Sequence, residues 1–225
     1  MRTLVTEDLG LVPFLEAYDC QRRAVDMRQT GAGHDTLFLL EHPHVITKGR
    51  NATGAALTAG PDLLAALGVQ LVETDRGGDV TYHGPGQLVG YPILQLEPER
   101  HDIRRYVHDV EEALLMTLDE LSINARRDPV HRGVWVEDRK IASVGIRISK
   151  WVTSHGFALN VDTDLSFFSL IVPCGISGCR MTSMSKELGR PVAMDEVKTV
   201  VARMFCDVFD RDHVGAVVRG EVGNG

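Results

Sequence analysis

The chain has 225 residues, 44% of them hydrophobic and 24% charged, a balance typical of a folded protein rather than a disordered, collagen-like or membrane chain. A chain of this length buries roughly 70% of the surface that its unfolded form exposes, so it needs neither disulfides nor a structural metal for stability. With 24 Lys and Arg against 31 Asp and Glu, its net charge of -7 argues against a general nucleic-acid binder.

The N-terminal segment does not resemble a targeting signal, because Glu7 and Asp8 stand where a signal peptide needs its apolar stretch. No segment approaches the ~18 consecutive apolar residues of a membrane span. The four cysteines show no paired spacing, as expected for reduced thiols: Cys20, Cys174, Cys179 and Cys206. We therefore expect a cytoplasmic protein without nucleic-acid or membrane partners, and we take a monomer as the default.

Hydrophobic periodicity predicts one domain over residues 1–225, built from short strands and a few helices. In chain order we expect a strand at 3–7, a helix at 11–30, strands at 36–41 and 45–48, a helix at 61–67, strands at 69–73 and 87–94, a helix at 102–121, strands at 134–137, 141–149 and 157–161, and a helix at about 195–209. Residues from about 211 to 225 are expected to form a loosely held tail. Strands in hairpin-like succession with few helices indicate an α+β fold with a mixed or antiparallel sheet and flanking helices.

Two of these helices carry more detailed predictions. The first is expected to pack one face on the core: Leu11, Phe14, Leu15, Tyr18 and Val25. The helix at 102–121 is the clearest in the sequence, because Asp102 suits an N-cap and apolar residues recur after it at steps of three and four.

The segment 76–87, Arg-Gly-Gly-Asp-Val-Thr-Tyr-His-Gly-Pro-Gly-Gln, follows a predicted strand and reads as a long glycine-rich loop ending near Pro85. Its glycines allow a ligand to approach the backbone, whereas Arg76, Tyr82 and His83 are costly side chains in a plain connection. The segment lacks the signatures of a P-loop and of a dinucleotide site. We interpret it as a binding segment, with a turn-rich connection as the alternative.

Two further residues are candidates for catalysis. Lys140 begins a strand of alternating apolar residues, where most lysines are solvated edge charges. Cys174 stands at the corner Pro173-Cys-Gly175, and buried cysteines are commonly small hydrophobes. A thiolate nucleophile needs local positive charge, so these residues by themselves leave both roles open.

Three blocks in one order resemble the octanoyltransferases of lipoate biosynthesis. They are 76–87 followed by Tyr91-Pro-Ile93, then Lys140-Ile-Ala-Ser-Val-Gly145 with Ser154-His-Gly-Phe-Ala-Leu-Asn160, and then Pro173-Cys-Gly175. Each block is modest alone, but together they span most of the chain and are highly specific. The resemblance implies a fold similar to the catalytic domain of biotin and lipoate ligases. It also implies transfer of an octanoyl or lipoyl group from acyl carrier protein to a lysine of a lipoyl domain, without ATP.

The resemblance also implies roles for individual residues. Cys174 becomes the nucleophile that forms the acyl thioester, and Lys140 becomes the group that lowers its pKa and shuttles protons. Backbone N–H groups near Gly175 or at Gly77–Gly78 are candidate donors to the oxyanion. No metal or other cofactor is implied. The implied substrate-binding residues are Arg76, Gly77, Gly78, Asp79, Val80, Thr81, Tyr82, His83, Ser143, Val144, Gly145, Gly156, Phe157 and Ala158.

The implied donor is octanoyl-acyl carrier protein, and the implied acceptors are apo lipoyl domains of 2-oxoacid dehydrogenases and the glycine cleavage H protein. The segment 126–150 holds seven basic side chains against three acidic ones, although the chain is acidic. Acyl carrier proteins are strongly acidic, so we hypothesise docking on Arg126, Arg127, Arg132 and Lys150. A solvated basic face is the alternative.

Other classes of protein remain open. An ATP-dependent lipoate or biotin ligase would share the fold and the lysine but would not need Cys174. A cysteine hydrolase would pair Cys174 with His83 or His155 as its base. A zinc site of Cys174, Cys179 and His155 lacks any Cys-x-x-Cys unit. A non-catalytic carrier-binding module would bind the donor without a covalent adduct.

Overall fold

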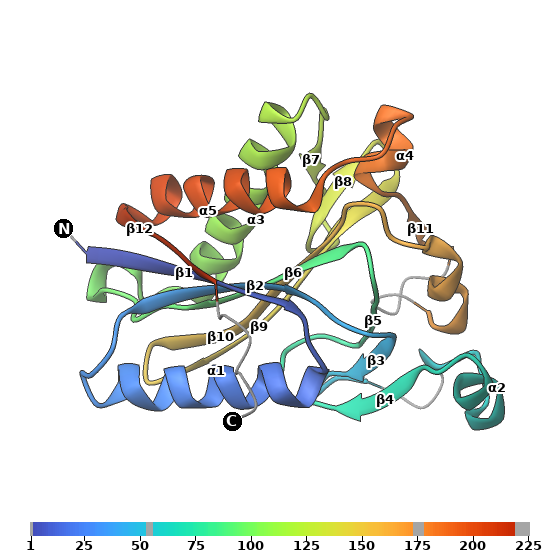
Figure 1. The fold of residues 1–225 in the computed structure, drawn as a ribbon, viewed down its shortest axis with the longest axis horizontal. Coiled ribbons are helices and arrows are strands. Elements are labelled where there is room, and N and C mark those ends of the chain that lie inside the picture. Colours follow the sequence, from blue (N-terminus) through green and yellow to red (C-terminus); the bar gives the residue numbers. More distant parts are fainter. Residues whose placement is uncertain (1, 53–55, 173–177, 219–225) are drawn as a thin grey trace, which may run out of the picture.

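The computed structural model describes residues 2–52, 56–172 and 178–218, and its elements are labelled in Figure 1. The strands are β1 (Arg2–Leu11), β2 (Asp35–Glu41), β3 (Val45–Lys48), β4 (Gln70–Glu73), β5 (Val80–His83), β6 (Gln87–Ile93), β7 (Arg126–Arg127), β8 (Val134–Val136), β9 (Arg139–Ser149), β10 (Val152–Asn160), β11 (Arg180–Met181) and β12 (Arg211–Val218). The α-helices are α1 (Phe14–Gln29), α2 (Pro61–Ala66), α3 (Ile103–Glu120), α4 (Met184–Leu188) and α5 (Met194–Phe209). Two short 3-10 helices are η2 (Pro98–Arg100) and η3 (Leu165–Leu170).

Among the described residues, nine strands form the main sheet in the order β12-β1-β2-β6-β10-β9-β8-β7, with β11 also paired to β9. The pairs β12–β1, β1–β2 and β11–β9 are parallel, and the other pairs are antiparallel. The predicted α+β class with a mixed sheet is therefore confirmed. A second, three-stranded sheet has the order β4-β3-β5 and lies beside the main sheet (Figure 1).

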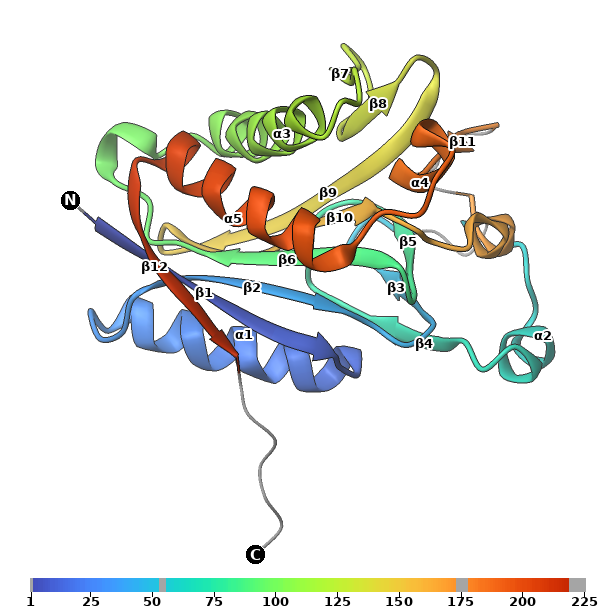
Figure 2. The same cartoon turned by 45° about the horizontal axis from the view of Figure 1, so that its top comes forward.

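Helices cover both faces of the main sheet. In Figure 2, α3 and α5 lie side by side over one face, and α1 lies against the other. The larger core cluster joins α3 and α5 to the sheet through residues such as Leu114, Phe157 and Phe205, and a smaller cluster joins the sheet to α1 through Ala17 and Tyr91. Within the described ranges, no helix combines the length and apolar composition needed to cross a bilayer.

The long helix α3 begins as its sequence predicts. Asp102 is the N-cap, and its Oδ1 accepts hydrogen bonds from the backbone N–H groups of Arg104 (2.7 Å) and Arg105 (3.1 Å). These two bonds satisfy donors that the first helical turn leaves without partners. The apolar residues at steps of three and four then face the sheet, with Val110 and Leu114 fully buried.

Several expectations differ from the structure. The predicted face of the first helix is wrong in part, because Leu11 belongs to β1 and Leu15 is 51% exposed, while Ala17 and Gln21 are buried. The glycine-rich segment after β4 contains a strand, β5, which pairs antiparallel with β3. Residues 211–218, expected within a loosely held tail, form β12 beside β1. Tertiary pairing decides both cases, because β5 has only four residues between glycine-rich flanks and β12 itself contains charges and a glycine.

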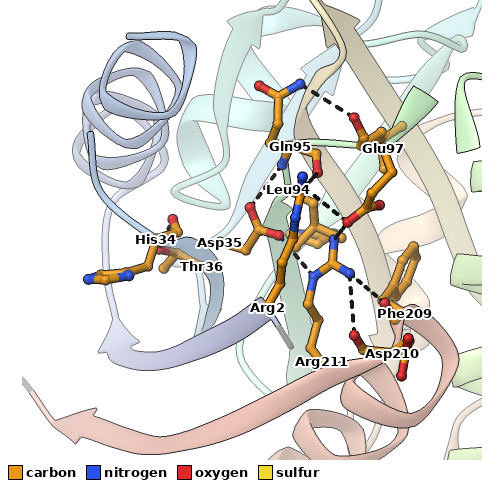
Figure 3. Close-up of polar contacts among 12 residues, drawn as sticks. Arg2, His34, Asp35, Thr36, Leu94, Gln95, Glu97, Phe209, Asp210 and Arg211 are labelled. Atoms are coloured by element: carbon orange, nitrogen blue, oxygen red, sulfur yellow. Dashed lines mark hydrogen bonds and ion pairs between the residues drawn. The ribbon is translucent and has the colours of Figure 1, made fainter. Parts of the chain in front are cut away.

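A buried ion-pair network anchors β12 at its first residue (Figure 3). The Nε of Arg211 lies 3.0 Å from Asp35 Oδ2, and both side chains are almost fully buried. The Nη2 of Arg211 also lies 2.8 Å from Glu97 Oε1. Asp35 Oδ1 accepts further bonds from Arg28 Nε and from the backbone N–H of Gln95, each at 2.9 Å. One carboxylate thus connects β2, α1, the end of β6 and β12.

Asp35→Asn should destabilise the fold by about 3–5 kcal/mol, because it removes the buried charge that Arg211 and Arg28 share and leaves Arg211 with Glu97 alone. Arg203→Met, which removes an ion pair with Glu120 in which both side chains are solvent-exposed, is the matched control and should cost under about 1 kcal/mol. Urea unfolding of the three proteins measures both values. Equal stability of wild type and Asp35→Asn would contradict the anchoring role.

Candidate active site

A cavity of about 410 Å³ lies where the main sheet meets the second sheet and the start of α3, within the size range of small-molecule sites. One wall comes from β9 and β10, and another from residues 76–83. Phe14, Tyr91, Ile103 and Val107 add apolar and aromatic surface. The cavity also includes Lys140.

The cavity follows an open edge of the main sheet. β8 pairs with β9 only between Arg139 and Ala142, so the edge of β9 beyond Ala142 has no strand neighbour on that side among the described residues. The N–H of Gly77 donates a hydrogen bond of 2.9 Å to the carbonyl oxygen of Ile146 on this edge. Because the cavity wraps around an edge, it is lined from both faces of β9, by Ser143 and Gly145 as well as Val144 and Ile146.

A β-bulge sets the direction of Lys140. In the register of β8 with β9, Val134 lies opposite Ala142 and Trp135 lies opposite Lys140, so Ile141 is the extra residue. Ile141 and the next residue both join the core under α3 and α5, which a regular strand does not allow. Lys140 is only 1% exposed, and its Nζ lies 5.4 Å from the centre of the Trp135 ring. The bulge thus directs Lys140 away from that core and over an aromatic face.

The 76–83 segment is held rigidly at Arg76. The buried guanidinium donates to the carbonyl oxygen of Thr47 at 2.7 Å and to its hydroxyl at 2.9 Å. The carbonyl oxygen of Arg76 in turn accepts a bond from the N–H of Arg50 at 3.0 Å. Arg76 therefore ties its own segment to β3 while it lines the cavity.

Apart from Tyr82, every substrate-binding residue that the sequence resemblance implies lines this one cavity. Tyr82 is fully buried in the core of the second sheet and hydrogen-bonds to His44 Nδ1 at 2.8 Å, outside the cavity wall. Of the candidate oxyanion donors, the N–H of Gly77 is bonded to the carbonyl oxygen of Ile146, whereas Gly78 and Gly175 stay predictions. Cys174, Pro173 and Gly175 lie outside the described residues.

His83 presents a defined tautomer to the cavity. The amide nitrogen of Gln87 donates to Asn160 Oδ1 at 2.9 Å, so Gln87 Oε1 faces His83 Nδ1 as an acceptor at 2.7 Å. His83 therefore carries its proton on Nδ1, which leaves Nε2 as an acceptor. Burial lowers the pKa of His83 to about 3, so the ring is neutral at physiological pH.

His42 lies beside His83, with ring centres 5.7 Å apart. Its Nδ1 donates to the carbonyl oxygen of Val12 at 2.7 Å, and its Nε2 accepts from the hydroxyl of Tyr91 at 2.8 Å. Burial lowers the pKa of His42 to about 4. Two neutral histidines thus lie in this buried region.

The far end of the cavity holds a His–Asp pair. His155 Nε2 lies 2.8 Å from Asp75 Oδ1, and the same carboxylate forms an ion pair with Arg147. The hydrogen bond from His155 lowers the pKa of Asp75 to about 2, while burial lowers the pKa of His155. His155 has a φ of 55°, unusual for a residue with a side chain, and its ring lies beside that of Tyr18 in α1. A neutral His155 therefore donates Nε2–H to the Asp75 carboxylate.

Sequence reasoning did not identify several residues of this cavity. Phe14 and Val107 have the spacing of ordinary core residues, so periodicity alone does not separate a cavity wall from a core. Arg50 and Arg147 carry no motif at the level of single residues. Both are charged residues near a glycine-rich or alternating segment. From the sequence alone, that feature is only a weak indication of a cavity residue.

The chain matches a known protein family and individual proteins along most of its length. The lipoyl protein ligase A/B catalytic domain matches residues 13–206. An octanoyltransferase from Solibacter usitatus is 49% identical over 210 residues, which cover 93% of this chain and 94% of that protein. An octanoyltransferase from Myxococcus xanthus is 46% identical over 222 residues, 96% of this chain, and this chain spans 62% of that longer protein.

Solved structures show the same fold at low identity. A bipartite lipoate protein ligase from Thermoplasma acidophilum superposes with a TM-score of 0.77 at 19% identity, covering 97% of this chain and 88% of that one. A biotin protein ligase from Aquifex aeolicus gives a TM-score of 0.53 at 13% identity, covering 93% and 69% of the two chains. The chain therefore belongs to the lipoyl protein ligase A/B catalytic family, among its octanoyltransferases. It is an acyltransferase of protein lipoylation, and the resemblance seen in the sequence is confirmed.

Buried histidines, His42 and His83 among them, predict how stability depends on pH. Their pKa values in the fold lie below the unfolded value of about 6.5, so the unfolded chain binds protons more readily. Stability should be complete above about pH 6.5 and fall below it, by about 1.4 kcal/mol per pH unit for each histidine, until the folded pKa is reached.

His83→Gln should make this decline shallower, since it removes one of the three histidines whose pKa burial lowers and keeps a donor for Gln87. Urea unfolding between pH 4.5 and 7 measures the slope, with the exposed His34→Gln as the matched substitution. If His83→Gln and wild type lose stability at the same rate, the neutral assignment of His83 is wrong.

Proposed function

We propose that this chain moves an octanoyl group from octanoyl-acyl carrier protein to the lysine amine of an apo lipoyl domain through a thioester on Cys174, with Lys140 transferring the protons. The acceptors that we propose are the lipoyl domains of 2-oxoacid dehydrogenases and the glycine cleavage H protein. We also propose that the chain acts as a monomer in the cytoplasm. That compartment keeps thiols reduced, which suits a chain with four cysteines in no paired spacing.

The observation that carries the proposal is the position of Lys140, a buried ammonium-bearing side chain in the wall of a ligand-sized cavity. Met181 in β11 pairs with Lys140, and the N–H of Thr182 donates to the carbonyl oxygen of Lys140 at 2.9 Å. β11 follows the segment that contains Cys174 by only a few residues. On the other side of that segment, the N–H of Val172 is bonded to the carbonyl oxygen of Ala56 at 2.8 Å.

The chemistry balances without a nucleotide. The Cys174 thiolate attacks the donor carbonyl, a new thioester forms, and the carrier leaves as a thiol after taking up a proton. Because one thioester replaces another, the acyl group stays activated. The acceptor amine then attacks the Cys174 thioester, an amide forms, and the Cys174 thiol is regenerated.

Lys140 suits both steps. As an ammonium it favours the thiolate of Cys174 and supplies a proton to the leaving carrier thiolate. As an amine it accepts the proton that the acceptor lysine must lose before it becomes a nucleophile. The face of the Trp135 ring, 5.4 Å from Nζ, favours a positive charge at that position.

An ATP-dependent ligase remains the second candidate, because the solved structures with this fold include lipoate and biotin protein ligases. Such an enzyme would activate a free acid with a nucleotide. The octanoyltransferase relatives are far more similar in sequence, at 46% and 49% identity, and favour the transferase.

Gly133 positions Lys140 in this proposal. A Cβ at Gly133 would lie 2.7 Å from Lys140 Cε and 2.4 Å from the carbonyl oxygen of Ala142, so no larger residue fits there without displacing the lysine. The N–H of Gly133 donates to Glu111 Oε1 at 2.7 Å, and this buried carboxylate belongs to α3. Helix α3 thus fixes the residue that packs on the proposed catalytic lysine.

Lys140→Met should abolish transfer, with a loss of at least about a thousandfold in kcat, because it removes the proton carrier and keeps the volume. Gly133→Ala should lower kcat by about tenfold to a hundredfold with little change in the KM for the donor, since it displaces Lys140 and Gly133 itself does not line the cavity. Steady-state kinetics with octanoyl-carrier and an apo lipoyl domain, together with thermal unfolding, separate these effects.

Lys150→Met, on the exposed β9–β10 hairpin, is the matched control. Folded Lys140→Met protein that turns over at the wild-type rate would refute the proposed role of the lysine. A rise in KM without a fall in kcat for Gly133→Ala would refute positioning by Gly133.

A further inference from the structure

We propose that the rim of the cavity around Arg50 and Arg132 is the docking surface for the acidic acyl carrier protein. This inference rests on the proposed function, since it concerns how the donor reaches the same cavity. It replaces the docking residues expected from the sequence, Arg126, Arg127, Arg132 and Lys150, by the pair Arg50 and Arg132.

The first observation is the charge of the cavity wall. Its lining contains five basic residues, Arg50, Arg76, Arg132, Lys140 and Arg147, and a single carboxylate, that of Asp79. The whole chain has a net charge of -7. A cleft of one sign with low-dielectric walls focuses the electric field at its opening, so an anionic partner is attracted there even by an acidic protein.

The second observation is that most of these basic side chains already form contacts within the protein. Arg76 is bound to Thr47, Arg147 is paired with Asp75, and Lys140 lies buried over Trp135. Arg50 and Arg132 are exposed. Across residues 2–52, 56–172 and 178–218, no ion pair or hydrogen bond holds the guanidinium of either, so both are available to a partner.

The third observation is that the backbones carrying these two side chains are fixed. The N–H of Arg50 is bonded to the carbonyl oxygen of Arg76 at 3.0 Å. Arg132 directly precedes Gly133, whose N–H is bonded to Glu111 at 2.7 Å. The rim therefore presents two charges from separate but anchored segments, which lowers the ordering cost of docking.

Exposed apolar side chains accompany the charges. Ile103, the first residue of α3, is 49% exposed, and Val130 is 78% exposed, and both line the same cavity. An apolar contact flanked by arginine is the composition of protein–protein interfaces. The rim thus combines long-range attraction with surface that a docked protein would bury.

The structure separates this rim from the basic segment 126–150. Arg127 is paired with Glu111 and Glu112, and Arg126 lies 3.8 Å from Asp128, so their charges are largely compensated. Lys150 lies ten residues along β9 from Lys140, roughly 33 Å at the rise of a strand. These residues do not form one patch, and of the four only Arg132 lines the cavity.

Charge favours the donor over the acceptor as the occupant of this rim. The carrier is acidic, whereas the acceptor must bring a lysine that is a cation until it loses its proton. A cationic rim attracts the carrier, whereas it repels the charged lysine that the acceptor brings. The rim therefore speeds the encounter with the donor, the step that begins each cycle.

The test compares two donors: octanoyl-acyl carrier protein, and the uncharged octanoyl thioester of N-acetylcysteamine. The double variant Arg50→Glu/Arg132→Glu of the full chain is measured beside wild type. Lys150→Glu/Arg190→Glu is the matched control, because it makes the same change in net charge at exposed residues outside the cavity. The kcat/KM for each donor is determined at saturating acceptor and several salt concentrations.

For the rim variant we expect kcat/KM with the carrier donor to fall about tenfold or more relative to its value with the small donor, and its salt dependence to flatten. The control should keep the wild-type ratio of the two donors. An unchanged ratio in the rim variant, or an equal fall in the control, would overturn the inference. If wild type transfers from neither donor, the proposed function itself fails.

Discussion

β9 has a neighbouring strand on its outer edge only as far as Ala142, and the backbone groups beyond that residue need other partners. The segment that follows β4 supplies one of them through the bond from Gly77 to Ile146. This requirement brings Arg76–His83 against β9, and the space left between that segment, the sheet and α3 is the cavity. A fully paired β9 would leave no such opening. The same half-paired strand carries Lys140 in its paired part, so the proposed chemistry and the substrate cavity share one element.

The cavity wall is basic, although the chain as a whole carries a net negative charge. Cations concentrate along its wall, while the histidines of the same region stay neutral because burial lowers their pKa values. Neutral rings next to fixed cations avoid further repulsion, and their tautomers are set by Gln87 and by the carbonyl oxygen of Val12. At the opposite end of the main sheet, buried Asp35 neutralises Arg211 and Arg28 and holds the last described strand in place (Figure 3).

The sequence predicted the α+β class, most elements to within a few residues, and the Asp102 cap, because these depend on local pattern. It did not reveal β5 or β12, whose pairing with β3 and β1 is tertiary. The resemblance pointed to the cavity wall correctly except at Tyr82, since a motif does not say which side of a strand faces a ligand. The bulge at Ile141 and the positive φ of His155 redirect the side chains of Lys140 and His155, and neither follows from alternation. Arg50 could be identified as a cavity residue only from the structure, because only the folded chain places it beside Arg76.

The central claim is a thioester on Cys174, and intact-mass spectrometry tests it most directly. Wild type and Cys174→Ser are each exposed to octanoyl-acyl carrier protein without ATP, and an apo lipoyl domain is then added. We predict a thiol-labile octanoyl adduct on wild type alone, which disappears as the lipoyl domain gains the same mass on its lysine. Absence of an adduct, together with transfer only when ATP and free octanoate are supplied, would contradict the account and establish the ligase alternative.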